Sequence, residues 1–171
     1  FGSYQEYGLL VLTTAMVLYA FQIYCDFDGY TNIACGAAQV MGITLMQNFK
    51  RPYFAVNIKD FWSRWHISLT SWFRDYLYVP LGGNRKGTLR KQINVLIVFC
   101  VSGLWHGASW NFVIWGAIHG LMQVVYNIFS DIKKKKTPSF STKLRNGILT
   151  FALVDFAWLF FRADSTGKAL G

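Results

Sequence analysis

Two histidines are the residues of this chain whose surroundings most favour chemistry. His66 and His106 lie far apart in the sequence, yet each follows a tryptophan, Trp65 or Trp105, in an otherwise apolar stretch. Burial disfavours the charged imidazolium, so both side chains are expected to be neutral and able to accept a proton. A neutral imidazole in a dry cavity suits general-base work on a hydroxyl group. The alternative for each is an ordinary packing role.

A third histidine, His119, follows in the next apolar stretch. Packing is the simpler interpretation of its position, and the alternative is that it faces the same cavity as His106. The histidines lack HxxxH or HxxE spacing and no carboxylate completes a ligand set, so we expect no metal site. The sequence also contains no GxSxG motif, which argues against a serine nucleophile of that type.

The segment Phe61–Arg85 must position His66. Its apolar stripe predicts an amphipathic helix with His66 on the apolar face, and Pro80 with Gly82-Gly83 is expected to end that helix. Asp60 is expected to cap its start. The residues that recur at helical spacing are Trp62, Trp65, His66, Leu69, Trp72, Phe73, Tyr76 and Leu77.

The segment Trp105–Trp110, WHGASW, must position His106. It lies between two apolar stretches, Ile93–Leu104 and Asn111–Phe129, which predict two helices or one broken helix. Non-helical backbone at membrane depth survives only where protein buries it or where it lines a wet cavity. The segment is therefore a candidate cavity wall, which places Ser109 among the candidate lining residues.

The composition is typical of an integral membrane protein. Hydrophobic residues make up 53% of the chain and aromatic residues 18%, while charged residues are only 15%, against about 25% in soluble domains. We expect spans at Tyr7–Cys25 and Asn146–Phe161, and a second, tightly packed helix at Thr31–Met46. Asp155, in the middle of the last span, is either buried against a structural partner or functional.

Two basic loops explain much of the net charge of +9. They are Arg85–Lys91 and Asp131–Lys143, and both flank apolar segments as the positive-inside bias predicts, so nucleic acid is not an expected partner. The first loop is either simply solvated or contacts a phosphate-bearing donor or lipid headgroups. Its candidate phosphate-attracting residues are Arg85, Lys86, Arg90 and Lys91.

Several long blocks resemble the membrane-bound O-acyltransferase family, in particular its bacterial alginate O-acetyltransferase-like branch, which includes relatives of the D-alanyl-lipoteichoic acid transfer protein. The blocks are FQIYCDFDGYTNIACG, NFKRPYFAVNIKDFWSRWHISLTSWFRDYLYVPLGGNRKG, GLWHGASWNFVIWGAIHG and VDFAWLFFRADS. The resemblance implies an all-α fold of polytopic transmembrane helices, with an amphipathic or re-entrant helix lining a central tunnel. Residues 1–171 would be a single partial domain, the C-terminal catalytic portion of a larger multi-pass protein of the bacterial cytoplasmic membrane.

The resemblance also implies an activity, acyl transfer from a thioester donor to a hydroxyl. His106 matches the family's catalytic base, and His66 matches a second residue of the same site. The co-substrate would be acetyl-CoA or another acyl thioester with no bound cofactor, the acceptor a cell-surface polysaccharide such as alginate, and the partners membrane lipid and an extracytoplasmic acetyltransferase. Candidate lining residues are Trp65, Trp105, Ser109, Asp28, Arg74, Asp75 and His119.

Two other classes of function compete with this interpretation. Asp26, Asp28, Asp155 and the histidines could form the polar path of a transporter or channel. Such proteins are often built from inverted repeats, and the two halves of this sequence show no internal similarity. The second competitor is a non-catalytic scaffold for a periplasmic acetylation partner, which would tolerate replacement of both histidines by neutral residues of similar size.

Overall fold

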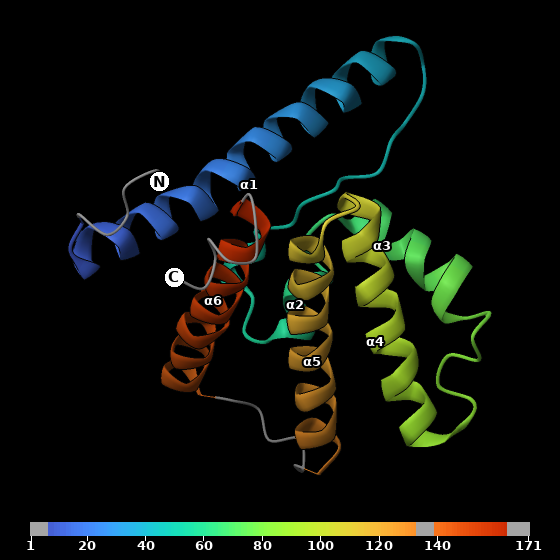
Figure 1. Cartoon of the computed structure of the whole chain (residues 1–171). Helices are drawn as coiled ribbons and strands as arrows, with labels where there is room; N and C mark the ends of the chain where they lie inside the picture. Colours follow the sequence, from blue (N-terminus) through green and yellow to red (C-terminus); the bar gives the residue numbers. More distant parts are fainter. Residues whose placement is uncertain (1–6, 133–138, 164–171) are drawn as a thin grey trace. The chain divides into compact units, whose positions relative to one another are not determined.

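The computed structural model describes residues 7–132 and 139–163, and regular structure in these residues is helical (Figure 1). The predicted all-α class is therefore confirmed. The lysine-rich part of the predicted loop Asp131–Lys143 lies outside the described residues. The elements are α1 Leu9–Val40, the 3₁₀ turn η2 Pro52–Phe54, α2 Ile58–Trp62, α3 Ile67–Phe73, the π-helical turn η3 Arg74–Tyr78, α4 Gly87–His106, α5 Trp110–Ile132 and α6 Phe140–Arg162.

The chain separates into two compact units, Phe1–Gln47 and Asn48–Gly171. The first unit contains α1, which runs without a break through the segment where we predicted an interruption between two helices. The reason is that neither Asp26, Asp28 nor Gly29 removes a backbone N–H, so the helical ladder continues. An interior glycine costs only about 1 kcal/mol relative to alanine.

Within the part of the chain that the structure describes, three helical segments are long and apolar enough to cross a membrane, Leu9–Val40, Trp110–Ser130 and Phe140–Arg162. The last helix contains the predicted span Asn146–Phe161, and the first contains the predicted span Tyr7–Cys25 apart from its first two residues, so both are confirmed as span candidates. The first helix continues past Cys25 and the last begins before Asn146, because the flanking polar residues do not interrupt helical hydrogen bonding.

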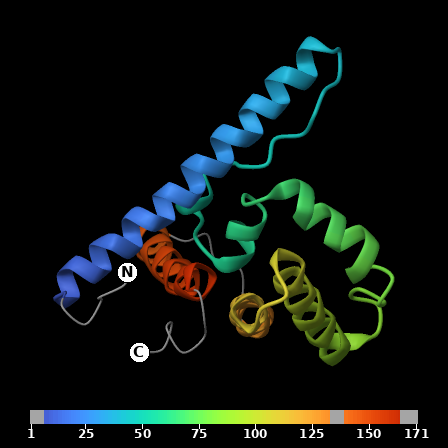
Figure 2. The same cartoon turned by 45° about the horizontal axis from the view of Figure 1, so that its top comes forward.

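In the second unit, α4 and α5 are two separate helices that pack side by side (Figures 1 and 2). Glycine permits this close approach. A Cβ on Gly103 would lie 2.1 Å from the carbonyl oxygen of Phe112, and one on Gly116 would lie 2.2 Å from that of Phe99. Backbone therefore meets backbone at two points along the α4–α5 seam, in the way small residues allow in membrane proteins.

The predicted continuous helix over Phe61–Arg85 is wrong. The chain forms α2, breaks at Ser63–His66, and resumes as α3 and η3. The break has a non-local cause. The N–H of Ile67 donates to the carbonyl of Asn48 at 3.0 Å, and the N–H of Lys50 donates to the carbonyl of Arg64 at 2.9 Å. These contacts replace the helical bonds that the amphipathic stripe predicts.

Candidate active site

His66 stands at the break between α2 and α3. Its backbone has φ 44° and ψ 55°, the left-handed conformation, and it is the N-cap residue of α3. That conformation costs a non-glycine residue roughly 1–2 kcal/mol and persists only where the surroundings enforce it. Here Asn48 enforces it, because its side-chain oxygen accepts from the backbone N–H of Ser68 at 3.1 Å and from the Ser68 hydroxyl at 2.6 Å.

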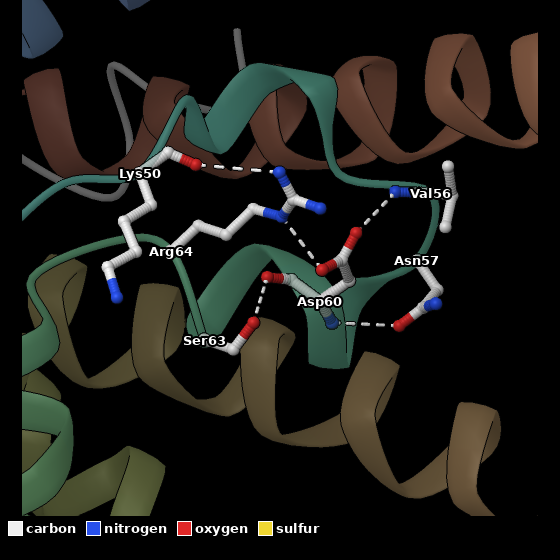
Figure 3. Close-up of polar contacts among 6 residues, drawn as sticks. All are labelled: Lys50, Val56, Asn57, Asp60, Ser63 and Arg64. Carbon is white, nitrogen blue, oxygen red and sulfur yellow. Dashed lines mark hydrogen bonds and ion pairs between the residues drawn. The ribbon is translucent and has the colours of Figure 1, made fainter.

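A polar network around Asp60 fixes the segment that leads into His66 (Figure 3). The Asp60 carboxylate accepts from the N–H of Val56 at 3.0 Å and from Nε of Arg64 at 2.8 Å. The predicted cap needs a correction, because Asn57 is the N-cap of α2 and its side chain accepts from the Asp60 N–H at 2.8 Å. Asp60 reaches back from the third helical position to the N–H of the residue before the N-cap, so the pair forms a variant of the capping box.

His106 is the last residue of α4, and aromatic rings surround its half-buried imidazole. The next residue, Gly107, directs the chain into α5, and its φ of 166° is ordinary extended backbone. The indole of Trp115 lies perpendicular to the imidazole of His106, with centroids 5.3 Å apart and an interplanar angle of 90°. The other ring neighbours of His106 are Trp105 at 5.0 Å, Phe161 at 5.3 Å and Phe112 at 6.5 Å.

The structure brings His66 and His106 to the same place. Trp105 is the common neighbour, because its indole lies 5.0 Å from the ring of His106 and 6.4 Å from the ring of His66. Burial and, secondarily, the proximity of His106 lower the pKa of His66 to about 4. Burial also lowers the pKa of His106. Both imidazoles are therefore neutral at pH 7, as general-base chemistry requires.

His119 lies deeper in the unit, with none of its surface exposed. It belongs to a ladder on α5 that sequence reasoning missed. Polar residues with one tryptophan recur every fourth position and all are buried, which places them along one inclined ridge of the helix. The signal was readable, since such regularity in an apolar span marks an inward face. The ladder consists of Asn111, Trp115, His119, Gln123 and Asn127.

Both ends of this ladder make hydrogen bonds to neighbouring helices. The amide of Asn111 donates to the carbonyl of Ala163, after α6, at 2.6 Å. The amide of Gln123 donates to Asn127 at 3.2 Å, and Asn127 donates to Gln92 of α4 at 3.3 Å. The ladder thereby ties α5 to both of its neighbours.

The remaining predicted lining residues divide among several environments. Trp105 is 58% exposed, whereas Trp65 is a core residue at 4% and packs on Phe49, Phe61 and Trp158. The Ser109 carbonyl accepts from the N–H of Phe112 at 3.2 Å, which starts α5. Arg74 and Asp75 form an exposed ion pair at 2.8 Å, and Asp28 belongs to α1 in the other unit.

The predicted phosphate-attracting residues lie at the opposite end of α4 from His106. Arg85 and Lys86 precede the helix, and Arg90 and Lys91 lie in its first turns. A helix of 20 residues is about 30 Å long. The structure therefore separates the basic cluster from the histidine pair by roughly the length of one helix.

Among the residues that the structure describes, no group of three or more His, Cys, Asp or Glu side chains could hold a metal ion. Cys25, Cys35 and Cys100 are free thiols. Asp155 of α6 is 8% exposed, and its Oδ1 atom has no hydrogen-bond partner within residues 7–132 and 139–163.

These features define a class of protein. It is an all-helical, multi-pass membrane protein that holds two neutral histidines of separate elements within one aromatic cluster. A model described as the membrane-bound O-acyltransferase family matches residues 3–163. The chain belongs to the membrane-bound O-acyltransferase family.

Curated relatives agree with this assignment. The chain is 43% identical over 152 residues to the peptidoglycan O-acetyltransferase of Helicobacter pylori, covering 89% of the chain and 29% of that protein. It is 44% identical over 147 residues to the probable alginate O-acetylase of Pseudomonas fluorescens, covering 86% and 29%. It is 34% identical over 163 residues to the teichoic acid D-alanyltransferase of Bacillus subtilis, covering 88% and 41%. The chain thus spans less than a third of the length of the first two relatives.

Proposed function

We propose that the His66–His106 cluster is the acyl-transfer site of a membrane O-acyltransferase that modifies hydroxyls of a cell-surface polymer. The observation that carries the proposal is the shared aromatic neighbour, Trp105, which joins two neutral imidazoles from separate elements. Membership of the family supports the reaction class. The names of the relatives support the class of acceptor, with alginate as one candidate polymer beside peptidoglycan and teichoic acid.

In this mechanism His106 takes the proton from the acceptor hydroxyl, and the oxygen attacks the carbonyl carbon of an acyl thioester. The carbon–sulfur bond then breaks, and the leaving thiolate takes the proton from the imidazolium. Donors close to the carbonyl would stabilise the oxyanion that forms in between. His66 and the indole N–H of Trp105 suit that role better than Trp65, whose ring is enclosed in the core.

The proposed donor is acetyl-CoA or a related acyl thioester, and the exposed cations at the start of α4 would attract its phosphates. Because those cations and His106 lie at opposite ends of α4, the donor would have to extend along this helix. The proposed tunnel would follow the same direction. An extracytoplasmic partner would complete transfer to the polymer.

The test uses the full-length protein in lipid vesicles with acetyl-CoA and a candidate acceptor polymer such as alginate, and it measures release of free thiol. We expect His106→Gln to abolish release, and Gly147→Ala, in α6 far from the histidines in sequence, to leave it unchanged. Undiminished release by His106→Gln would overturn the base assignment. Solute flux without acyl chemistry would favour the transporter, and absence of both activities would favour the scaffold.

A further inference from the structure

His119 is buried without satisfying its polar atoms. The side chain is fully enclosed, and neither Nδ1 nor Nε2 has a hydrogen-bond partner among the described residues. Its ring lies nearly parallel to those of Phe61, at 6.3 Å and 8°, and Phe99, at 6.4 Å and 21°. Leaving a buried polar group unpaired is destabilising, whereas a phenylalanine of similar shape would have no polar atoms to leave unpaired.

Three indoles near His119 share this property. The Nε1 atoms of Trp62, Trp115 and Trp158 are buried and lack a hydrogen-bond partner in the described part of the chain. Their rings lie 5.0, 4.9 and 6.5 Å from the ring of His119, and they come from α2, α5 and α6. Native proteins leave only a few such groups per 100 residues, so the clustering of four of these side chains calls for a ligand.

The donors and acceptors of the cluster define that ligand. An indole N–H only donates, while a neutral imidazole donates at one nitrogen and accepts at the other. The ligand must therefore accept hydrogen bonds and also donate one. None of the four side chains supplies a charge when the imidazole is neutral, so a buried ion would lack a counter-charge in the cluster. A neutral hydroxyl group meets both requirements.

We propose that His119, Trp62, Trp115 and Trp158 form a buried site for a hydroxyl-bearing ligand, either water or the alcohol group of an acceptor. The site adjoins the proposed catalytic cluster, because Trp115 contacts both His119 at 4.9 Å and His106 at 5.3 Å. A hydroxyl bound here lies one ring away from the base. Because Trp115 separates this hydroxyl from His106, it is not the hydroxyl that His106 deprotonates, and His119 is a positioning residue that holds the acceptor or a bound water beside the reacting group.

The direct test is the structure of the full-length protein, at a resolution that shows ordered water, with and without methanol as a minimal alcohol. Density within hydrogen-bond distance of a His119 nitrogen in plain buffer would assign the site to water. Density that appears only with methanol would assign it to an alcohol. No density in either preparation, or a protein side chain bonded to both nitrogens, would overturn the proposal.

A second test compares His119→Phe with His119→Gln and rests on the proposed function. Phenylalanine fills the space without polar atoms, so we expect an unchanged or raised unfolding temperature and about a tenfold loss of acyl transfer. Glutamine keeps a donor and an acceptor and should retain most activity. Wild-type activity in His119→Phe would contradict the positioning role. If the wild-type protein transfers no acyl group, the proposed function fails while the structural test still decides the hydroxyl site.

Discussion

The indole of Trp115 meets the imidazole of His106 at a right angle, with ring centroids 5.3 Å apart. Trp115 is 1% exposed, so its own position is fixed by the packing around it. Trp115 comes from α5 and His106 from the end of α4, so the contact spans the turn between the two helices. The orientation of the proposed base therefore depends on a core residue, and this dependence leads to the first prediction.

Replacing Trp115 should impair both stability and activity. Trp115→Ala removes a buried indole, which typically costs about 3–5 kcal/mol, and it frees the His106 ring. Trp115→Phe keeps an aromatic face and should retain more stability. Thermal unfolding in detergent and thiol release measure the two effects. If Trp115→Ala transferred acyl groups at the wild-type rate, the ring contact would have no part in positioning the base.

Acyl transfer should be lost at a lower pH than it would be if both histidines had the ordinary pKa of about 6.5. The site needs neutral imidazoles, and burial lowers the pKa values of both His66, to about 4, and His106. The rate of acyl transfer should therefore stay level as pH falls from 7 through 6.5 and decline only at lower pH. The measurement is the initial rate of acyl transfer as a function of pH. A rate that has already fallen to half near pH 6.5 would contradict this expectation.

The same shift makes stability depend on pH. The pKa of His66 is lower in the folded protein than in the unfolded chain, so the unfolded chain binds more protons between about pH 6.5 and 4. The stabilising contribution is fully present above pH 6.5 and is lost as pH falls toward 4. His66→Asn, which also tolerates the left-handed conformation, should weaken this acid dependence. Unfolding temperatures of the wild type and of His66→Asn, measured from about pH 6.5 to pH 4, test this expectation.

Gly116 should not accept even one methyl group. A Cβ there would lie 2.2 Å from the Phe99 carbonyl oxygen, so Gly116→Ala must push α4 and α5 apart at a cost of about 1–3 kcal/mol or more. Gly147→Ala is the matched control, because its nearest neighbour would be the Ala55 carbonyl oxygen at 3.8 Å. Equal unfolding temperatures for the two variants would show that the α4–α5 seam is looser than the structure indicates.

Replacing Asp60 should destabilise the protein more than replacing Asp75, although both carboxylates pair with an arginine. Asp60→Ala removes both the acceptor for the Val56 N–H and the partly buried ion pair with Arg64, at a cost of about 1–2 kcal/mol. Asp75→Ala removes an exposed pair with Arg74 and should leave stability unchanged. Thermal unfolding of the two variants measures this difference. Equal unfolding temperatures would show that the contacts of Asp60 add no more stability than an exposed ion pair does.

Much of the helical fold could be predicted from the sequence because local periodicity and apolar length determine it. The spans within α1 and α6 and the pair of helices that meet at Trp105–Trp110 follow from such patterns. The break at His66 could not be predicted, since the backbone of Asn48 and Lys50 creates it from a distant part of the sequence. The helical stripe over that segment is real, but tertiary hydrogen bonds outweigh it.

The candidate site was predicted in part for the same reason. His66 and His106 stood out by residue type and apolar context, whereas their common neighbour Trp105 became visible only when two separate elements met. Trp65 looked equivalent to Trp105 in sequence, yet one is enclosed and the other exposed. The close backbone contacts at Gly103 and Gly116 were not predicted, because they arise only where α4 and α5 meet in the fold, and the tight packing predicted for Thr31–Met46 stays a prediction.

The most direct test of the central claim is the ester content of the cell-surface polymer in a strain that carries the full-length protein, as wild type or as His106→Ala. Membrane levels of the two proteins must be equal. Since His106 is the proposed base, we predict that the variant loses the acyl esters. Ester content equal to that of the wild type would contradict acyl transfer at His106 and leave this residue with a packing role.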